Sequence, residues 1–243
     1  ESSNNVYGNT TVTGLVPNDG QDVEVKCAMM TGPHPDRMAA LDSTVLYHEL
    51  THAMVARLNV GQLSGGAQAA GLHEGWGDYF AIALTAEPED DFSANYPVFA
   101  YSARQHPSAL GLNHYYFGAR RFPYSTDLTT SNPLKFGFID PAQAASFPFG
   151  SAPRNTNFDG VSRSERYRVG EVWATTLLDC RAQLALGHGF DANELLMQFV
   201  IDGMKLNPGS PGMIESRDAI LQADLIRSGG ANQGPLWVAF KNR

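Results

Sequence analysis

Two histidines and a glutamate within one apolar stretch have the spacing of a metal-dependent hydrolase. Residues 45–53 read VLYHELTHA, which places His48 and His52 four positions apart with Glu49 directly after the first histidine. On a helix such positions lie one turn apart on the same face, so both imidazoles can bind one zinc ion. Glu49 is rotated by roughly 100° and can act as the general base toward a zinc-activated water. Because this short pattern also arises by chance, a third ligand has to support it.

The best candidate for the third ligand is Glu74, which lies far enough after His52 for one helix to end and a second helix to return beside it. Glu74 and Asp78 are four positions apart and share a helix face. Glu74 can bind the metal, while Asp78 can accept a hydrogen bond from the outer ring nitrogen of a ligand histidine. The alternative is that both carboxylates only complement the dipole at a helix start. His73 is a rival ligand, but it points away from this face, and we assign it to the cleft lining or to a contact at the helix start.

The elements that must position these residues are a strand and a series of helices. The alternation over residues 22–30 predicts a half-exposed strand. Apolar periodicity and capping residues predict helices at about 41–58, 73–86, 167–186, 192–206, 211–226 and 236–240. We expect the Gly- and Ala-rich residues 59–71 to form a loop, and the irregular residues 93–165 to wrap the surface or shape a binding cleft.

Composition restricts the partners of the chain. Its 243 residues, 43% of them apolar, can form one large domain or two closely packed lobes. The net charge of −8, from 25 acidic and 17 basic residues, argues against nucleic acid or anionic lipid as the main partner. No run of apolar residues is long enough for a membrane span. The acidic run at 87–92 predicts a solvated loop, with a Ca²⁺ site as the lesser alternative.

Neither the cysteines nor the start of the chain identifies a compartment. Cys27 and Cys180 can form one bridge, but two thiols do not define a disulfide framework. The chain begins with a polar segment and without a signal peptide, which we interpret as a processed or trimmed N-terminus.

Most of the chain resembles one known family, the fungalysins. Residues 74–78, Glu-Gly-Trp-Gly-Asp, resemble the third-ligand motif of that family, Glu-Gly-Trp-(Ser/Gly)-Asp. Further similar strings, in the same order, are residues 35–37, 40–42, 57–58, 123–126, 170–174, 202–206 and 217–224, and Trp237. Fungalysins are secreted zinc metallopeptidases, made with a removable propeptide, and belong to the thermolysin-like zincins that use a glutamate ligand.

The resemblance implies an α+β zincin fold with two sub-lobes that form one catalytic unit. Residues 1–60 would hold a small sheet and the zinc-binding helix, and residues 61–243 a mainly helical sub-lobe with the third ligand. His48, His52 and Glu74 would hold one Zn²⁺, and Glu49 would be the general base. An extended substrate would pair with the edge strand before the zinc helix, here at Ala28 and Met29. We expect polypeptide substrates, a monomer, and neither nucleic acid nor membrane as a partner.

Two departures from the family pattern concern the site. Only about 42 residues precede the predicted zinc helix, so either the sheet is reduced or upstream sequence has been cut away. Where the family carries a histidine that stabilises the oxyanion, this chain has Tyr167, flanked by two arginines, Arg166 and Arg168. The phenol can donate a hydrogen bond with help from either arginine, or Tyr167 only packs. Arg120, just before the 123–126 string, either contacts substrate or forms a salt bridge.

The sequence therefore predicts a secreted zinc-dependent endopeptidase. One alternative is a zincin-type aminopeptidase, which needs acidic residues to anchor a free substrate amine, and no motif for them is present. The other alternative is a catalytically silent zinc-containing binding protein, which Tyr167 and the short N-terminal part would favour.

Overall fold

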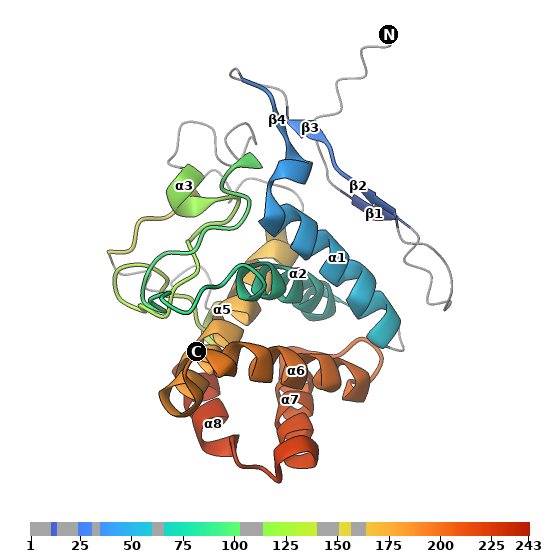
Figure 1. Cartoon of the computed structure of the whole chain (residues 1–243), viewed down its shortest axis with the longest axis vertical. Helices are drawn as coiled ribbons and strands as arrows, with labels where there is room; N and C mark the ends of the chain where they lie inside the picture. The colour runs from blue at the N-terminus through green and yellow to red at the C-terminus, as the bar shows by residue number, and fades with distance from the viewer. Residues whose placement is uncertain are drawn as a thin grey trace.

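The computed structural model describes residues 11–13, 24–30, 35–59, 66–102, 114–139, 151–156 and 164–243. This part of the chain is mainly helical and carries two small antiparallel sheets, which is compatible with an α+β fold. The strands lie at one end of the molecule next to the first helix, α1 (Ser43–Leu58). The last three helices lie at the other end (Figure 1), and they are α6 (Ala192–Leu206), α7 (Met213–Ser228) and α8 (Gln233–Asn242). Among the described helices, none is both long and apolar enough to cross a membrane.

Each sheet consists of two short strands. β1 (Thr11–Thr13) pairs with β2 (Glu24–Lys26), and β3 (Met29–Met30) pairs with β4 (Arg37–Met38). The prediction of one strand over residues 22–30 is therefore wrong, although residues 22 and 23 lie outside the described part. The strand divides because the carbonyl of Ala28 accepts a hydrogen bond from the Ala39 amide at 3.0 Å, which turns the chain toward a different partner.

The helices form most of the described structure. They are α1 (Ser43–Leu58), α2 (Ala67–Ala83), α3 (His114–Phe117), α5 (Ser164–His188), α6 (Ala192–Leu206), α7 (Met213–Ser228) and α8 (Gln233–Asn242), with 3₁₀ turns η1 (Ala39–Leu41), η4 (Phe136–Ile139) and η6 (Gly189–Asp191). All six predicted helices are confirmed, with ends shifted by a few residues. Asp42 caps α1, since its carboxylate accepts a hydrogen bond from the Thr44 amide at 3.2 Å.

Helix α2 begins earlier than predicted, so the expected loop over 59–71 is wrong from Ala67 onward. Alanine has the highest helix propensity, and Ala69 and Leu72 are buried, so packing supports the additional turns. Consequently Glu74 lies inside the helix and not in its first turn. The dipole effect falls off within the first turn, which removes the alternative that Glu74 and Asp78 serve only that purpose.

The packing of α2 against α5 positions the site. The two helices can approach closely because Gly75 has no side chain. A Cβ at this position would lie only 2.7 Å from the carbonyl oxygen of Gly170. The indole of Trp76 meets Trp173 edge to face at 6.4 Å, and Trp173 stacks on Phe240 of α8 at 6.5 Å. This arrangement brings the Glu74 face of α2 next to the start of α5.

The two cysteines do not form a bridge. Cys180 of α5 is buried in the core formed by the helices, and Cys27 is half-buried between β2 and β3. Both thiols are free.

Candidate active site

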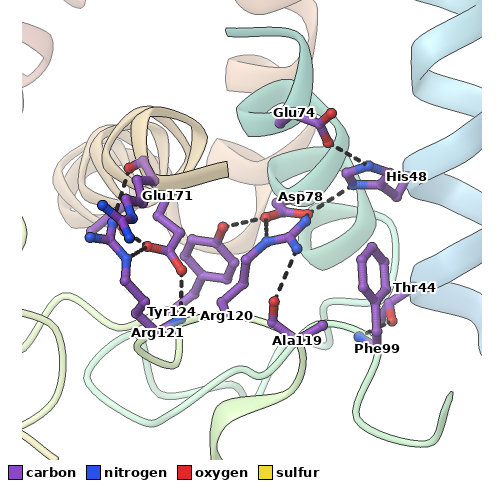
Figure 2. A network of polar contacts seen from close by, with 12 residues as sticks. Thr44, His48, Glu74, Asp78, Phe99, Ala119, Arg120, Arg121, Tyr124 and Glu171 are labelled. Atoms are coloured by element: carbon purple, nitrogen blue, oxygen red, sulfur yellow. Dashed lines mark hydrogen bonds and ion pairs between the residues drawn. The ribbon is translucent and has the colours of Figure 1, made fainter. Parts of the chain in front are cut away.

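His48, His52 and Glu74 converge at the place where α1 and α2 face each other. One donor atom from each residue lies within 4.8 Å of the others. Glu74 Oε2 is 3.3 Å from His48 Nε2 and 3.8 Å from His52 Nε2. Figure 2 shows Glu74 and Asp78 on α2 pointing toward His48 on α1. The sequence-predicted ligands thus meet around one common point.

The chemistry of this donor set fits zinc. Two imidazole nitrogens and one carboxylate oxygen are the protein ligands that catalytic zinc sites use, with one position left open. His48 Nδ1 hydrogen-bonds the Asp78 carboxylate at 2.8 Å, which leaves Nε2 for a metal on the Glu74 side. Within the described residues no other group of three His, Cys, Asp or Glu side chains converges in this way, and none forms at the acidic run 87–92.

The electrostatics of the two histidines differ. Burial alone would lower the pKa of His48, but its contacts with the carboxylates of Asp78 and Glu74 outweigh burial and raise the pKa to about 9. These two carboxylates that favour a proton on His48 would also attract a metal cation in its place. Burial, and then the neighbouring His48, hold the pKa of His52 well below its usual value. His52 is therefore neutral and offers a lone pair, as a metal ligand must.

Glu49 lies beside the cluster without belonging to it. Its carboxylate is largely buried, and burial raises its pKa to about 7, against the opposing effect of His48. In the described part of the chain no donor hydrogen-bonds this carboxylate. The charges of His48 and Glu74 therefore act on Glu49, and no hydrogen bond from a described residue fixes its carboxylate.

The sequence predicted either a cleft-lining role or a contact at the helix start for His73. The contact at the helix start is ruled out, because α2 begins at Ala67 and His73 lies within the helix. Its ring packs on the ring of His52, with centroids 4.2 Å apart. Burial lowers the pKa of His73 to about 4, so it too is neutral near pH 7. It supports the His52 ring from the side.

Asp78 accepts hydrogen bonds from three residues at once. Besides His48, the Arg120 guanidinium donates from Nε and Nη2 at 2.6 and 2.7 Å, and the Tyr124 hydroxyl donates to Oδ2 (Figure 2). Burial would raise the pKa of Asp78, but Arg120 and His48 hold it well below its usual range. Asp78 is therefore an anion that fixes the orientation and tautomer of His48.

A second buried ion pair lies beside the first. Glu171 of α5 accepts hydrogen bonds from the backbone N–H and from Nε of Arg121, each at 2.6 Å. The adjacent arginines Arg120 and Arg121 therefore attach one loop to α2 and to α5 respectively. Sequence spacing could not predict either ion pair, because the partners are 42 and 50 positions apart in the sequence.

The predicted substrate-contacting residues are not gathered in one place. Arg120 is buried and forms the salt bridge with Asp78, the alternative considered for it. Met29 is 44% exposed on β3, where a peptide can reach it, and the carbonyl of Ala28 is already bonded to Ala39. The carbonyl of Arg168 accepts a hydrogen bond from Arg121 at 3.2 Å. Tyr167 lies with its ring 5.2 Å from the Arg120 guanidinium carbon, next to the cluster.

Three contacts at the site were not predicted from the sequence. The Tyr124 hydroxyl reaches Asp78, the Arg166 side chain lies 3.8 Å from Glu74 Oε1, and the Phe99 ring meets the His48 ring edge to face at 5.1 Å. Tyr124 belongs to the 123–126 string noted above, which was the one available signal for it.

Gly77 makes room for the His48 ring, and an alanine there should displace it. A Cβ at position 77 would lie 2.5 Å from His48 Nδ1 and 2.7 Å from Cε1. We expect Gly77→Ala to weaken zinc affinity about 10- to 100-fold, the usual effect of disturbing a ligand's supporting contacts. Competition with a chromophoric chelator measures it.

Gly187→Ala is the matched control for this experiment. It lies in the last turn of α5, and nothing is within 4 Å of an added Cβ. We expect unchanged zinc affinity and a gain of up to about 1 kcal/mol in unfolding free energy from helix propensity. Equal zinc affinities for Gly77→Ala and the parent would contradict the assigned position of His48.

Comparison with known proteins supports a metallopeptidase. Residues 4–243 match the family model described as fungalysin metallopeptidase. The chain is 30% identical to "Extracellular metalloproteinase MEP" of Neosartorya fischeri and 32% identical to proteins of the same name from Pyricularia oryzae and Fusarium vanettenii. Each alignment covers 97% of this chain and 35% of the relative, so the chain spans about a third of the length of these relatives. Because the family model covers nearly the whole sequence, and the His–His–Glu cluster lies within it, the chain belongs to the fungalysin metallopeptidase family.

Proposed function

We propose that this chain carries the active site of a secreted zinc-dependent endopeptidase of the zincin type. The supporting observation is the convergence of His48, His52 and Glu74 within 4.8 Å, with Glu49 beside them. The names of the relatives, extracellular metalloproteinases, support an extracellular location and protein substrates.

In this proposal His48, His52 and Glu74 hold the zinc ion, which when bound lowers the pKa of a coordinated water and polarises the substrate carbonyl. Asp78 keeps the lone pair of His48 Nε2 directed at the ion by accepting the proton of Nδ1. Glu49 takes a proton from the attacking water and passes it to the leaving amine, since its carboxylate has no hydrogen-bonding partner among the described residues.

Substrate would lie along β3, with Tyr167 on the opposite side. Met29 is exposed on that strand, and the residues around it can add an extended peptide to the small sheet. Burial, followed by the charge of Glu74, raises the pKa of Tyr167, so its hydroxyl keeps its proton and can donate a hydrogen bond to an oxyanion. Arg168 would assist from the next position on α5.

Tyr167→Phe tests this role of the phenol. We expect kcat to fall about 10²-fold while KM and zinc affinity stay close to the parent values, because one oxyanion donor is lost. Tyr115→Phe is the control, since Tyr115 is 58% exposed and, among the described residues, its hydroxyl accepts only a 3.4 Å hydrogen bond from Arg37. Equal kcat values for Tyr167→Phe and Tyr115→Phe would show that Tyr167 only packs.

Removal and return of zinc test the proposed function as a whole. Treatment with a chelator should abolish cleavage of an unfolded protein, and zinc should restore it. Zinc at about 1,000 times its Kd should also raise the unfolding free energy by about 4 kcal/mol. Mass spectrometry of the fragments should show internal cuts. Sequential trimming from the amino end would indicate an aminopeptidase, and zinc-dependent stability without cleavage would indicate a silent binding protein.

A further inference from the structure

Arg181 on α5 is a buried cation that forms no salt bridge with a described residue. Arg181 is 2% exposed, and its Nη1 donates a hydrogen bond to the side-chain oxygen of Asn193 at 3.2 Å. Its Nε has no hydrogen-bond partner in the described structure. The guanidinium carbon lies 4.7 Å from the centroid of the Phe92 ring. Burial lowers the pKa of Arg181, and the opposing effects of Tyr79, Tyr96 and Asp90 do not offset it.

Arg37, which is 8% exposed, donates to the Tyr101 carbonyl, whereas the three other described arginines that are less than 5% exposed each have a carboxylate partner. Arg120 pairs with Asp78, Arg121 with Glu171, and Arg243 with Asp179. An uncompensated buried charge is strongly unfavourable, which is why buried arginines are normally paired. Arg181 departs from this pattern, and the missing negative charge can come from a ligand.

A pocket opens beside this guanidinium. Its volume is about 180 Å³, and a cavity of about 150 Å³ admits benzene, so one ring-sized group fits. The apolar part of the lining is made by Phe92, Ala185 and Phe190. Pockets that combine apolar walls with a few polar groups are typical of small-molecule sites.

The pocket also carries negative charge. Glu87 is exposed and Asp90 is half-buried, both line the pocket, and neither forms an ion pair with a described residue. Asp90 accepts a hydrogen bond from the Glu87 amide at 2.9 Å, and its charge also acts on Arg181. These carboxylates would repel a simple anion on its way to Arg181. They would attract a ligand that presents a cationic group together with its carboxylate.

We propose that this pocket binds a free α-amino acid with an apolar side chain. The carboxylate would lie on Arg181, the ammonium group near Glu87 and Asp90, and the side chain between Phe92 and Phe190. The site is separate from the zinc cluster. Tyr167 and Arg181 are 14 positions apart on α5 (181 − 167), which corresponds to about 21 Å along the helix. The inference therefore does not depend on the proposed peptidase activity.

Calorimetric titration of the zinc-loaded chain with L-phenylalanine and two analogues tests the ligand class. 3-Phenylpropanoate lacks the ammonium group, and 2-phenylethylamine lacks the carboxylate. We expect phenylalanine to bind. The Kd of 2-phenylethylamine should be at least about tenfold higher, because its charge-assisted contact with Arg181 is lost. Equal affinity of phenylpropanoate and phenylalanine would overturn the proposal, as would no binding of phenylalanine at about 10 mM.

Variants place the ligand in the pocket. Arg181→Met should raise the Kd for phenylalanine roughly 10- to 100-fold, and Glu87→Gln roughly two- to fivefold. Glu89→Gln is the control, because Glu89 is exposed in the same loop but does not line the pocket. An unchanged Kd in Arg181→Met, or an equal change in Glu87→Gln and Glu89→Gln, would overturn the proposal. Circular dichroism checks folding, and should Arg181→Met not fold, Glu87→Gln and the analogue series decide.

Discussion

Glu49→Gln should abolish peptide cleavage and leave zinc binding intact. The amide has the shape of the carboxylate but cannot take a proton from the attacking water, and loss of a general base lowers turnover by about 10² to 10⁴-fold. Glu49 is not among the three converging donors, so the metal site itself is unchanged. The measurement is kcat on a fluorogenic peptide together with zinc content by atomic absorption.

Glu194→Gln is the matched control for this change. It removes an exposed carboxylate on α6, far in sequence from the cluster, and should alter neither turnover nor zinc content. Cleavage by Glu49→Gln at the rate of the Glu194→Gln protein would show that Glu49 is not the base. A joint loss of zinc and activity would instead assign Glu49 to metal binding.

Asp78→Asn should have the largest effect on stability. The substitution keeps the size of the side chain but removes the charge that faces His48 and Arg120, both of which are buried. Breaking a buried ion pair from one side typically destabilises a protein by about 3–5 kcal/mol, and a lost contact to a ligand histidine weakens metal binding about 10- to 100-fold. Urea unfolding with and without zinc measures both effects.

Asp202→Asn provides the comparison at the surface. Asp202 pairs with Lys205 and Arg227 at 3.1 and 3.0 Å, on exposed parts of α6 and α7. Exposed pairs of this kind contribute about 0–1 kcal/mol, so we expect a small change in unfolding free energy and none in zinc affinity. If Asp78→Asn were no more destabilising than Asp202→Asn, the buried network around Asp78 would not be structural.

The residues that orient His48 do not all come from α1 and α2. Arg120 and Tyr124 come from the loop before residue 139, and both donate to the carboxylate that orients His48 (Figure 2). Arg121 attaches the same loop to Glu171 on α5. The loop therefore connects α1, α2 and α5 through the buried carboxylates of Asp78 and Glu171. A substitution in the loop should consequently change the orientation of His48, a proposed metal ligand.

Periodicity was sufficient to predict which candidate site residues share a helix face. His48 and His52 are one turn apart, as are Glu74 and Asp78, so the side chains that share a face follow from the helical repeat alone. The same repeat predicted all six helices, because apolar residues at helical spacing must be buried together. By contrast, the start of α2 at Ala67 depended on burial against α5, which a window of local sequence does not contain.

By itself the sequence predicted the candidate zinc-ligand residues, their spacing and the resemblance to the family. Only the tertiary structure decided that Arg120 is a partner of Asp78, that Tyr124 joins it, and that Arg181 forms no salt bridge with a described residue. The physical reason is that hydrogen bonds and ion pairs between residues more than 40 positions apart depend on how helices pack, and not on the local pattern around either partner. The sequence thus predicted which groups could bind a metal, and the fold determined which groups hold them in place.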